Sequence, residues 1–427
     1  MSDAAIPVNP PRRVLLASLV GTTIEFYDFY LYGIAAALVF GALFFPGEST
    51  AAQQLSAFAT FAIAFIARPV GAALFGHYGD RVGRKAMLVA SLLVMGLSTV
   101  LIGLLPGYAA IGIVAPLLLC LLRFGQGLGL GGEWGGAALV ATENAPAGRR
   151  AWYGMFPQLG APLGFILANG LFLWLAVSFG EQEFREYGWR IPFLLSAVLL
   201  IVGLYVRTTL VESPVYRAAM ARHQRADVPL VTLLRQHGRV TLLGALAMVV
   251  CYALFYIATV FALGYGVQTL QVSRADFLAI ECGAIVFMAI GILASAWLAD
   301  RVGRRPVLLA GATLAALSGF LLEPAFATGD LRVIGAFLAL ELLLMGITFG
   351  PMGAFLPELF PTPVRYTGAA VAYNLGGILG ASFAPLLAQW LVSHGGLAIV
   401  GGYITTAALL SLGALWLLHE TRERPLD

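Results

Sequence analysis

The composition of this 427-residue chain excludes a water-soluble fold. Hydrophobic residues make up 60% of the chain and charged residues only 11%, whereas a soluble surface needs about a quarter of charged residues. The net charge of +3 is small and the basic residues are dispersed, which argues against a nucleic-acid partner. We therefore expect an all-α membrane protein whose surroundings are the lipid bilayer.

Twelve apolar segments follow one another, each long enough to cross a bilayer as a helix of roughly twenty residues. Their expected ranges are 14–45, 52–77, 86–106, 110–140, 151–178, 190–210, 239–266, 275–298, 306–326, 332–356, 366–392 and 396–418. The first segment is too long for a signal-peptide core, so we interpret it as a retained span. The polar stretch 211–238 joins six spans to six. This predicts an N-terminal bundle of residues 1–210, a cytoplasmic central linker and a C-terminal bundle of residues 239–427.

The basic residues outside the spans divide unevenly between the two sides of the membrane. With twelve spans, nineteen lysines and arginines fall on the side of the two termini, and four fall on the other side, at Arg185, Arg190, Arg274 and Arg332. Loops rich in lysine and arginine stay in the cytoplasm. Both termini are therefore expected to be cytoplasmic.

Two motifs occur once in each predicted half. Residues 76–85 read GHYGDRVGRK, and DRVGR returns at residues 300–304, a period of about half the chain. In the second motif, ENAP at residues 143–146 matches ELFP at residues 358–361. A period of this length predicts two similar halves.

These residues resemble the major facilitator superfamily, whose loop between spans two and three carries the pattern GxxxDRxGRK. Within it, the chain is similar to the metabolite:proton symporter family, which includes proline/betaine, shikimate, citrate and 2-oxoglutarate transporters. The similar segments are GTTIEFYDFY at 21–30, ARPVG at 67–71, RFGQG at 123–127, GEWGG at 132–136 and ESP at 212–214. In the second copy of the loop motif, Ala296 replaces the leading glycine. The resemblance implies two six-helix bundles in a bacterial inner membrane and proton-coupled transport.

Ionisable side chains inside apolar spans are costly, and they normally face a cavity or a partner. Here they are Glu25, Asp28, Arg68, Arg123, Glu133, Glu281 and Glu341. Spans three, six, nine and twelve have none in their interiors. In the fold that the resemblance implies, these four spans are outer supports and the other eight line the central cavity.

Three of these acids are candidates for proton coupling. Glu25 and Asp28 lie three residues apart on one helix face, and two close carboxylates in a low dielectric cannot both ionise cheaply. We therefore expect one of them to hold a proton near neutral pH, with Glu133 as the third candidate. The alternative is that Glu25 or Asp28 is permanently paired with Arg68 or Arg123 and only joins helices.

Arg68 and Arg123 are candidates for binding substrate, because a guanidinium holds a carboxylate through two parallel hydrogen bonds. Each could instead form a fixed structural ion pair. The remaining substrate-binding candidates are polar or amphipathic side chains on presumed cavity spans, namely Tyr32, Gln158, Tyr252, Tyr256, Tyr373 and Asn374. For each tyrosine, packing is the alternative. The arginines indicate a solute with a carboxylate, and the acids leave room for a zwitterion.

Charged residues of the repeated motifs are placed to pair where neighbouring spans reach the cytoplasm. They are Asp80, Arg81, Arg84, Glu143, Arg150, Asp300, Arg301, Arg304, Glu358 and Arg365. Asp80 could also meet the positive N-terminus of span eleven. Such pairs would form a cytoplasmic gate that closes when the cavity opens outward, or they would only fix topology.

Other functions leave little signal in the sequence. Residues 127–132 satisfy the dinucleotide fingerprint, but they lie inside an apolar span with no strand before them, so no cofactor is expected. We expect Gly127 and Gly131, like Gly132 and Gly136, to let helices approach closely.

Neither the cysteines nor the histidines have the spacing of a metal site. We predict that the protein is not an enzyme. We predict instead a monomeric transporter that imports a small polar metabolite with protons by alternating access. A proton-driven exporter or antiporter and an uncoupled facilitator are the alternatives, and a membrane sensor is a remote one.

Overall fold

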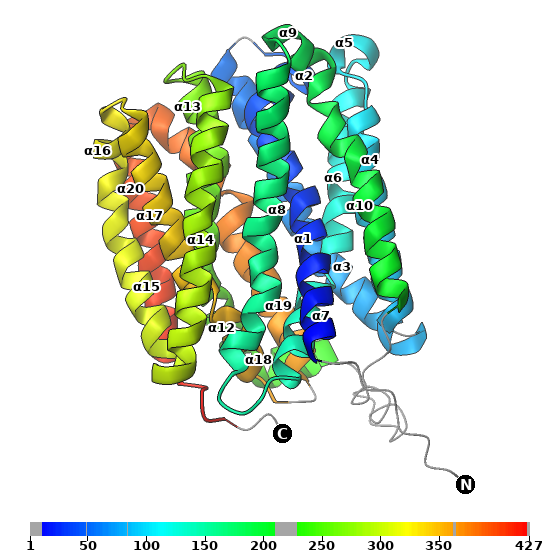
Figure 1. Ribbon diagram of the computed structural model, residues 1–427, viewed down its shortest axis with the longest axis vertical. Helices are drawn as coiled ribbons and strands as arrows, with labels where there is room; N and C mark the ends of the chain where they lie inside the picture. Colours follow the sequence, from blue (N-terminus) through cyan, green and yellow to red (C-terminus); the bar gives the residue numbers. More distant parts are fainter. Residues whose placement is uncertain (1–10, 48, 83, 210–228, 362–363, 425–427) are drawn as a thin grey trace.

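The computed structural model describes residues 11–47, 49–82, 84–209, 229–361 and 364–424. These residues form a bundle of long helices that run side by side, and no strand occurs among them (Figure 1). The expected all-α fold is confirmed. We call the end of the bundle where α1 begins and α20 ends the proximal end, and the opposite end the distal end.

The N-terminal half contains six helical spans, with short pieces at the distal end. Its elements are α1 (Pro11–Ala35), η1 (Ala36–Phe40), α2 (Gly41–Phe44), α3 (Thr50–Val82), α4 (Arg84–Leu104), α5 (Tyr108–Ile111), α6 (Val114–Leu130), α7 (Trp134–Glu143), α8 (Arg150–Ser178), α9 (Glu181–Glu183), η2 (Phe184–Gly188) and α10 (Arg190–Thr209). Helices α6 and α7 form one span with a break at residues 131–133.

The C-terminal half repeats this plan. Its elements are α12 (Pro229–Tyr256), η3 (Ile257–Phe261), α13 (Ala262–Gln268), α14 (Arg274–Val302), α15 (Arg304–Ser318), η4 (Gly319–Leu321), α16 (Leu322–Ala327), α17 (Leu331–Phe349), α18 (Met352–Glu358), α19 (Arg365–Gly377), η6 (Ile378–Ser382) and α20 (Ala384–Leu417). Span ten is broken between α17 and α18, at the position that corresponds to the break in span four.

All twelve expected spans are present. Nine helices among the described residues are individually long and apolar enough to cross a membrane. The other three spans are α4, whose apolar part is shorter, α10, which follows a bend of 41°, and the last part of α20. Helix α20 is divided by Gly396, whose φ of +78° ends one span and begins the next. Span seven begins at Pro229, inside the stretch predicted as linker, and residues 210–228 of that stretch lie outside the described residues.

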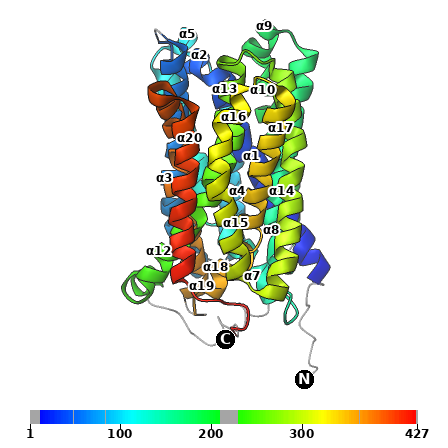
Figure 2. The ribbon, with the colours of Figure 1, turned by 90° about the vertical axis from the view of Figure 1, so that its left-hand side faces the viewer.

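The supporting helices lie at the edges of the bundle. Helices α4 and α10 pack against each other at one edge, and α15 packs against α20 in the other half (Figures 1 and 2). Their outward faces carry large exposed apolar side chains such as Leu97, Val198, Leu317 and Trp416. These faces are suited to lipid, because aliphatic and aromatic side chains cost nothing there.

Glycines bring α3 and α6 into close contact, as the sequence predicts for one of its two pairs. A Cβ added at Gly127 would lie 2.2 Å from the carbonyl oxygen of Ala64 on α3. A Cβ added at Gly131 would lie 2.0 Å from the carbonyl oxygen of Arg68, one turn further along α3. At Gly132 the nearest atom, a side-chain carbon of Phe75 on α3, would be 3.3 Å away, which is a tight contact, and at Gly136 the nearest atom would be 3.5 Å away, which is ordinary packing. The prediction is therefore confirmed most clearly for Gly127 and Gly131.

Replacing Gly127 by alanine is expected to destabilise the protein, because α3 and α6 would have to separate. Overpacking of this kind costs about 1–3 kcal/mol. Gly170→Ala on α8 is the matched control, since no atom lies within 4 Å of a Cβ at that position. Thermal unfolding in detergent should give a lower Tm for Gly127→Ala and an unchanged or higher Tm for Gly170→Ala. Equal Tm values for both variants would contradict the tight contact.

Candidate functional site

Arg123 on α6 is fully buried against aromatic rings. Its guanidinium carbon lies 4.3 Å from the ring centroid of Phe29, 4.0 Å from that of Tyr32 and 4.7 Å from that of Phe61. Nη1 donates to Gln126 Oε1 at 2.9 Å, while Nε and Nη2 have no hydrogen-bond partner among the described residues. The rings stabilise part of the buried charge. The N–H groups without a partner are hydrogen-bond donors that a carboxylate would satisfy.

Arg68 on α3 also contacts Phe29. Its guanidinium carbon is 4.5 Å from the ring centroid of Phe29 and 4.3 Å from that of Phe65, and its side chain is buried. Its Nε also has no hydrogen-bond partner among the described residues. The charges of Arg68 and Arg123 are close enough to interact. An anion bound between them would therefore relieve their repulsion.

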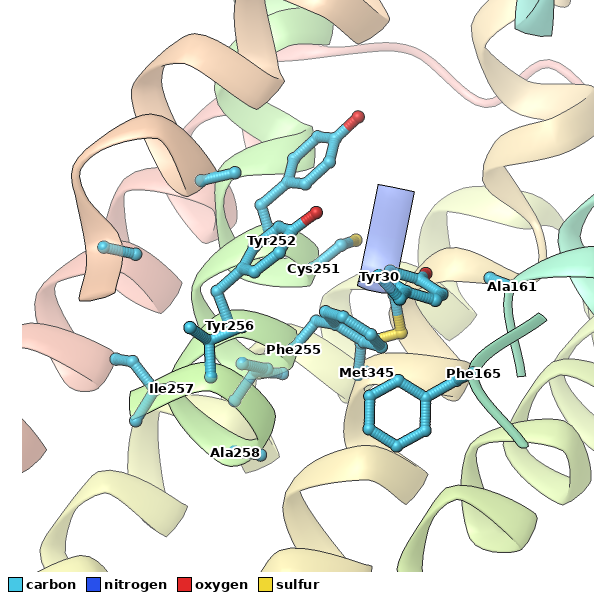
Figure 3. Close-up of a cluster of buried hydrophobic side chains, with 14 of the residues drawn as sticks. Tyr30, Ala161, Phe165, Cys251, Tyr252, Phe255, Tyr256, Ile257, Ala258 and Met345 are labelled. Atoms are coloured by element: carbon cyan, nitrogen blue, oxygen red, sulfur yellow. The ribbon is translucent and has the colours of Figure 1, made fainter. Parts of the chain in front are cut away.

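A small cavity lies between the two halves, and Phe61, whose ring contacts Arg123, is one of the residues that line it. It is lined by Tyr30, Phe61 and Phe165 from the N-terminal half and by Phe255, Tyr256 and Glu281 from the other half. Figure 3 shows Tyr30 and Phe165 facing Phe255 and Tyr256 of α12. The cavity volume is about 10 Å³, which is room for about one water molecule. A metabolite can enter only after the halves move.

Two of the predicted tyrosines belong to a stack that the sequence did not reveal. Tyr252 donates from its hydroxyl to the carbonyl oxygen of Tyr373 at 3.4 Å. The ring of Tyr373 lies parallel to that of Trp134, with centroids 3.9 Å apart. Tyr256 contacts the ring of Phe61 at 5.2 Å, close to the arginines. The tyrosines thus connect α12 and α19 with the N-terminal half.

Asp28 connects to Arg123 through two polar side chains. Ser196 on α10 donates a short hydrogen bond to Asp28 Oδ1, and the Thr99 side chain on α4 also contacts this carboxylate. Gln126 donates to Thr99 Oγ1 at 2.8 Å and accepts from Arg123. The arrangement differs from a direct pair between Asp28 and an arginine.

The sequence analysis missed Ser196, Thr99 and Gln126. The available signal was their polarity within otherwise apolar spans. Of the two other predicted members of this region, Glu25 is buried one turn before Asp28, and the hydroxyl of Tyr32 bonds that of Thr60.

Gln158 and Asn374 occupy matching positions in the two halves, and each bonds across to the other half. Gln158 Nε2 donates to the carbonyl oxygen of Phe349, at the end of α17, at 3.0 Å. Asn374 Nδ2 donates to the carbonyl oxygen of Gly131, just after α6, also at 3.0 Å. Gln158 also accepts from the indole of Trp134 at 2.9 Å. Each amide therefore binds at the break in the broken span of the opposite half.

The remaining acids inside spans have different surroundings. Glu133 lies in the break between α6 and α7 and is buried. Glu341 on α17 lies beside Ser318, within the C-terminal half. Glu281 on α14 lines the cavity between the halves. Of these three, Glu281 is the one that the structure places against both halves.

At the proximal end, Asp300 from the C-terminal half caps the first turn of α8. Its two carboxylate oxygens accept from the backbone N–H groups of Ala151 and Trp152, each at 2.9 Å. Arg304 bonds the same carboxylate at 3.1 Å and makes two hydrogen bonds to Glu358, at 3.1 and 3.2 Å. The negative carboxylate is favourable at a helix N-terminus. The sequence suggested this kind of contact for Asp80, and the structure has it for the matching residue Asp300.

The other predicted gate residues make weaker or local contacts. Nη1 of Arg150 donates to a carbonyl oxygen of the C-terminal segment at 2.6 Å and lies 3.8 Å from Glu358. Arg301 stacks on a tryptophan of its own helix, Arg365 donates to a nearby backbone carbonyl, and Glu143 is exposed. The side chains of Asp80, Arg81 and Arg84 lie outside the described residues.

At the distal end, polar contacts again join the halves. Gln268 on α13 donates to the side chain of Gln54 on α3 and to the carbonyl oxygen of Ala37 at 3.0 Å. Arg274 at the start of α14 lies 2.8 Å from Glu181, whose side chain is largely exposed. The Glu181 carboxylate is the exposed partner of this pair, so water competes with Arg274 for it. Polar contacts thus join the halves at both ends of the cavity.

A family model described as sugar (and other) transporter matches residues 14–236 and 228–427. The chain belongs to this family and is a multi-pass membrane transporter of the major facilitator superfamily, with twelve helices in two halves, and not an enzyme. The expected superfamily and fold are confirmed.

Curated relatives cover almost the whole chain. It is 54% identical over 425 residues to the inner membrane metabolite transport protein YhjE of Escherichia coli, covering 98% of this chain and 97% of that protein. It is 36% identical to the shikimate transporter of Escherichia coli (98% and 97% covered) and 34% identical to the proline/betaine transporter of Salmonella typhimurium (97% and 85% covered). The solved proton:xylose symporter XylE from E. coli matches with a TM-score of 0.77, 21% identity and 97% of each chain covered, which shows the common fold.

The surroundings of Glu420, which lies beyond the last span, predict that the stability of the folded protein depends on pH. Partial burial raises the pKa of its carboxyl, but backbone N–H groups of Arg304, Arg305, Thr421 and Arg422 donate to it, and the pKa lies below its ordinary value of 4.5. A lowered pKa in the folded state stabilises the protein above pH 4.5, and this stabilisation is lost as the pH falls through the folded-state pKa.

Glu420→Gln is therefore expected to have a lower Tm than wild type at neutral pH and a smaller drop in Tm on acidification. Thermal unfolding in detergent from neutral pH to below 4.5 measures both effects. Glu323→Gln, which changes an exposed acid at the distal end, is the control. If Glu420→Gln and wild type lose the same Tm on acidification, the stabilising role of Glu420 is refuted.

Proposed function

We propose that this protein imports a small metabolite bearing a carboxylate together with protons, by alternating access of the two halves to a central site. The observation that carries the proposal is the pair of buried arginines, Arg68 and Arg123, whose guanidinium groups include N–H groups without a hydrogen-bond partner among the described residues. A buried cation with open donors is costly, and a carboxylate is the group that satisfies a guanidinium best. Tyr252, Tyr256 and Tyr373 would contact the rest of the solute.

Asp28 is the proposed site of the coupled proton. Its neighbour Thr99 accepts a hydrogen bond from Gln126, which accepts one from Arg123, so a substrate carboxylate on Arg123 would change the polar surroundings of Asp28. Binding of substrate and binding of a proton would then favour each other, which symport requires. Glu25 and Glu133 are the second candidates for this proton.

The contacts at the two ends support alternating access. Breaking the proximal contacts of Asp300, Gln158 and Asn374 would open the cavity on one side, and breaking those of Gln268 would open it on the other. The excess of basic residues makes the proximal end cytoplasmic, with both termini there. The name of the relative YhjE supports a bacterial inner membrane. We propose that the monomer is the transporting unit.

The names of the relatives support the solute class. Shikimate, proline and betaine, named for the relatives, all carry a carboxylate, and proline and betaine are zwitterions. We infer that the solute of this chain is an organic acid or a zwitterion of similar size.

The proposal predicts proton-driven accumulation that depends on Asp28. In proteoliposomes given labelled organic acids and betaines, one solute should accumulate only with an inward proton gradient. Asp28→Asn should abolish accumulation, because the amide cannot exchange a proton, and Glu186→Gln at an exposed distal position should not. Accumulation that ignores the gradient would indicate a facilitator, and uptake driven by an outward gradient would indicate an antiporter.

A second prediction concerns Arg123. Arg123→Lys keeps the charge but loses the planar group that stacks on the rings, so KM for the transported solute should rise by about 10- to 100-fold, the worth of charged hydrogen bonds of about 1.5–3 kcal/mol. Arg332→Gln at the exposed distal end is the control. Initial rates of uptake give KM for both variants, and an unchanged KM in Arg123→Lys would exclude Arg123 from the binding site.

A further inference from the structure

One buried acid at the interface between the halves has no part in the mechanism above. Glu281 lies on α14 about two turns from its distal start at Arg274, and its side chain is fully buried. It lines the cavity together with Tyr30 and Phe165 of the N-terminal half. Neither of its carboxyl oxygens has a hydrogen-bond partner among the described residues.

Asn169 on α8 lies beside this carboxyl. Its Nδ2 donates to the carbonyl oxygen of Leu278 at 3.1 Å and contacts Cys282 Sγ at 3.6 Å, so α14 fixes the orientation of the amide. Its Oδ1 has no hydrogen-bond partner among the described residues. Unsatisfied acceptors on Glu281 and Asn169 thus face the same interface, and a proton on Glu281 would supply the missing donor.

The surroundings of Glu281 favour this proton. Tyr30 and Tyr256 line the same cavity, and α14 itself carries Arg274, Asp276 and Cys282 in its distal part and Asp300 and Arg301 at its proximal end. The helices packed against α14 carry Tyr265 and Glu341, Arg332 at the distal start of α17, and Arg150, Tyr153, Arg304 and Arg305 toward the proximal end. Arg274 is the cation nearest to Glu281 along α14, and it pairs with Glu181. Glu341 lies beside Ser318 instead. Burial makes a charged carboxylate costly here, and the neighbouring Asn169 amide offsets only part of that cost, so the neutral acid is favoured.

We propose that Glu281 is a second proton-binding site, at which the bound proton ties α14 to α8 through Asn169 Oδ1 and holds the distal end of the cavity closed. When the distal end opens, water reaches the carboxyl and the proton returns to the solution from which it came. Proton binding is then stronger in the closed form, and raising the pH opens the distal end. Since uptake and release occur on one side, this proton is not transported.

The inference rests on alternating access as proposed above, and it adds a proton that sets the pH dependence of opening without changing the number of protons carried per solute. Asp28 and Glu281 therefore have separable roles. A variant at Glu281 should change the gate and keep accumulation, whereas a variant at Asp28 should do the reverse.

Distances between spin labels test the gate directly. The full chain, with its three cysteines replaced by alanine, would carry labels at Gln182 on α9 and Arg332 on α17, which are exposed at the distal ends of the two halves. Pulsed dipolar measurements in lipid nanodiscs then give the closed and open populations as a function of pH. In the otherwise wild-type chain, the closed-to-open ratio should fall with rising pH, by up to about tenfold per pH unit.

Two substitutions separate the proton from the fold. Glu281→Gln provides a permanent amide donor for Asn169 Oδ1, so the closed fraction should be high and independent of pH, while some opening remains. Asn169→Leu removes the acceptor at similar volume and should shift the population toward the open form. The proposal would be overturned if the pH dependence of opening persisted unchanged in Glu281→Gln. It would also be overturned if the otherwise wild-type chain showed no pH dependence of opening.

Asp28→Asn distinguishes this failure from failure of the transport mechanism. Asp28→Asn should keep the pH-dependent opening and lose proton-driven accumulation. Glu281→Gln should lose the pH dependence of opening and still accumulate solute, at a lower rate. If opening becomes independent of pH in Asp28→Asn and not in Glu281→Gln, the gating proton resides on Asp28 and the assignment to Glu281 is wrong.

Discussion

The cost of placing charge away from water governs this structure. Arg68 and Arg123 are buried in a bundle that lipid surrounds, and the protein offers them aromatic faces where a soluble protein would offer solvent. The rings reduce the cost of the charge but leave N–H groups without acceptors. These unsatisfied donors are the feature on which the proposed binding of a carboxylate rests.

The twofold repeat accounts for the way in which the halves are joined. Gln158 and Asn374 come from matching positions, and each donates to a carbonyl oxygen that a broken helix leaves open in the other half. A continuous helix would already have used those carbonyl groups. The breaks in spans four and ten thus serve a purpose in the interface, since they provide acceptors at places where two amides can reach them.

Polar contacts join the halves at both ends, and this suits a protein that must open at each end in turn. Asp300 binds backbone N–H groups of α8, and Gln268 binds a backbone carbonyl next to η1. Water can replace each of these bonds when the halves separate, so the net cost of opening is small. An extensive apolar contact at either end would have been harder to break. The apolar rings remain between the two gates, where they exclude water.

The sequence by itself determined the membrane setting, the twelve spans, the twofold repeat and the set of buried ionisable residues, because hydropathy, charge bias and repeats are local or periodic properties of the chain. It also found the close approach at Gly127 and Gly131. Only the tertiary structure decided which groups meet: that Asp28 reaches Arg123 through Thr99 and Gln126, that Gln158 and Asn374 bond across the halves, and that Glu281 faces Asn169. These contacts join spans far apart in the chain, and they depend on helix rotation and depth, which hydropathy leaves open.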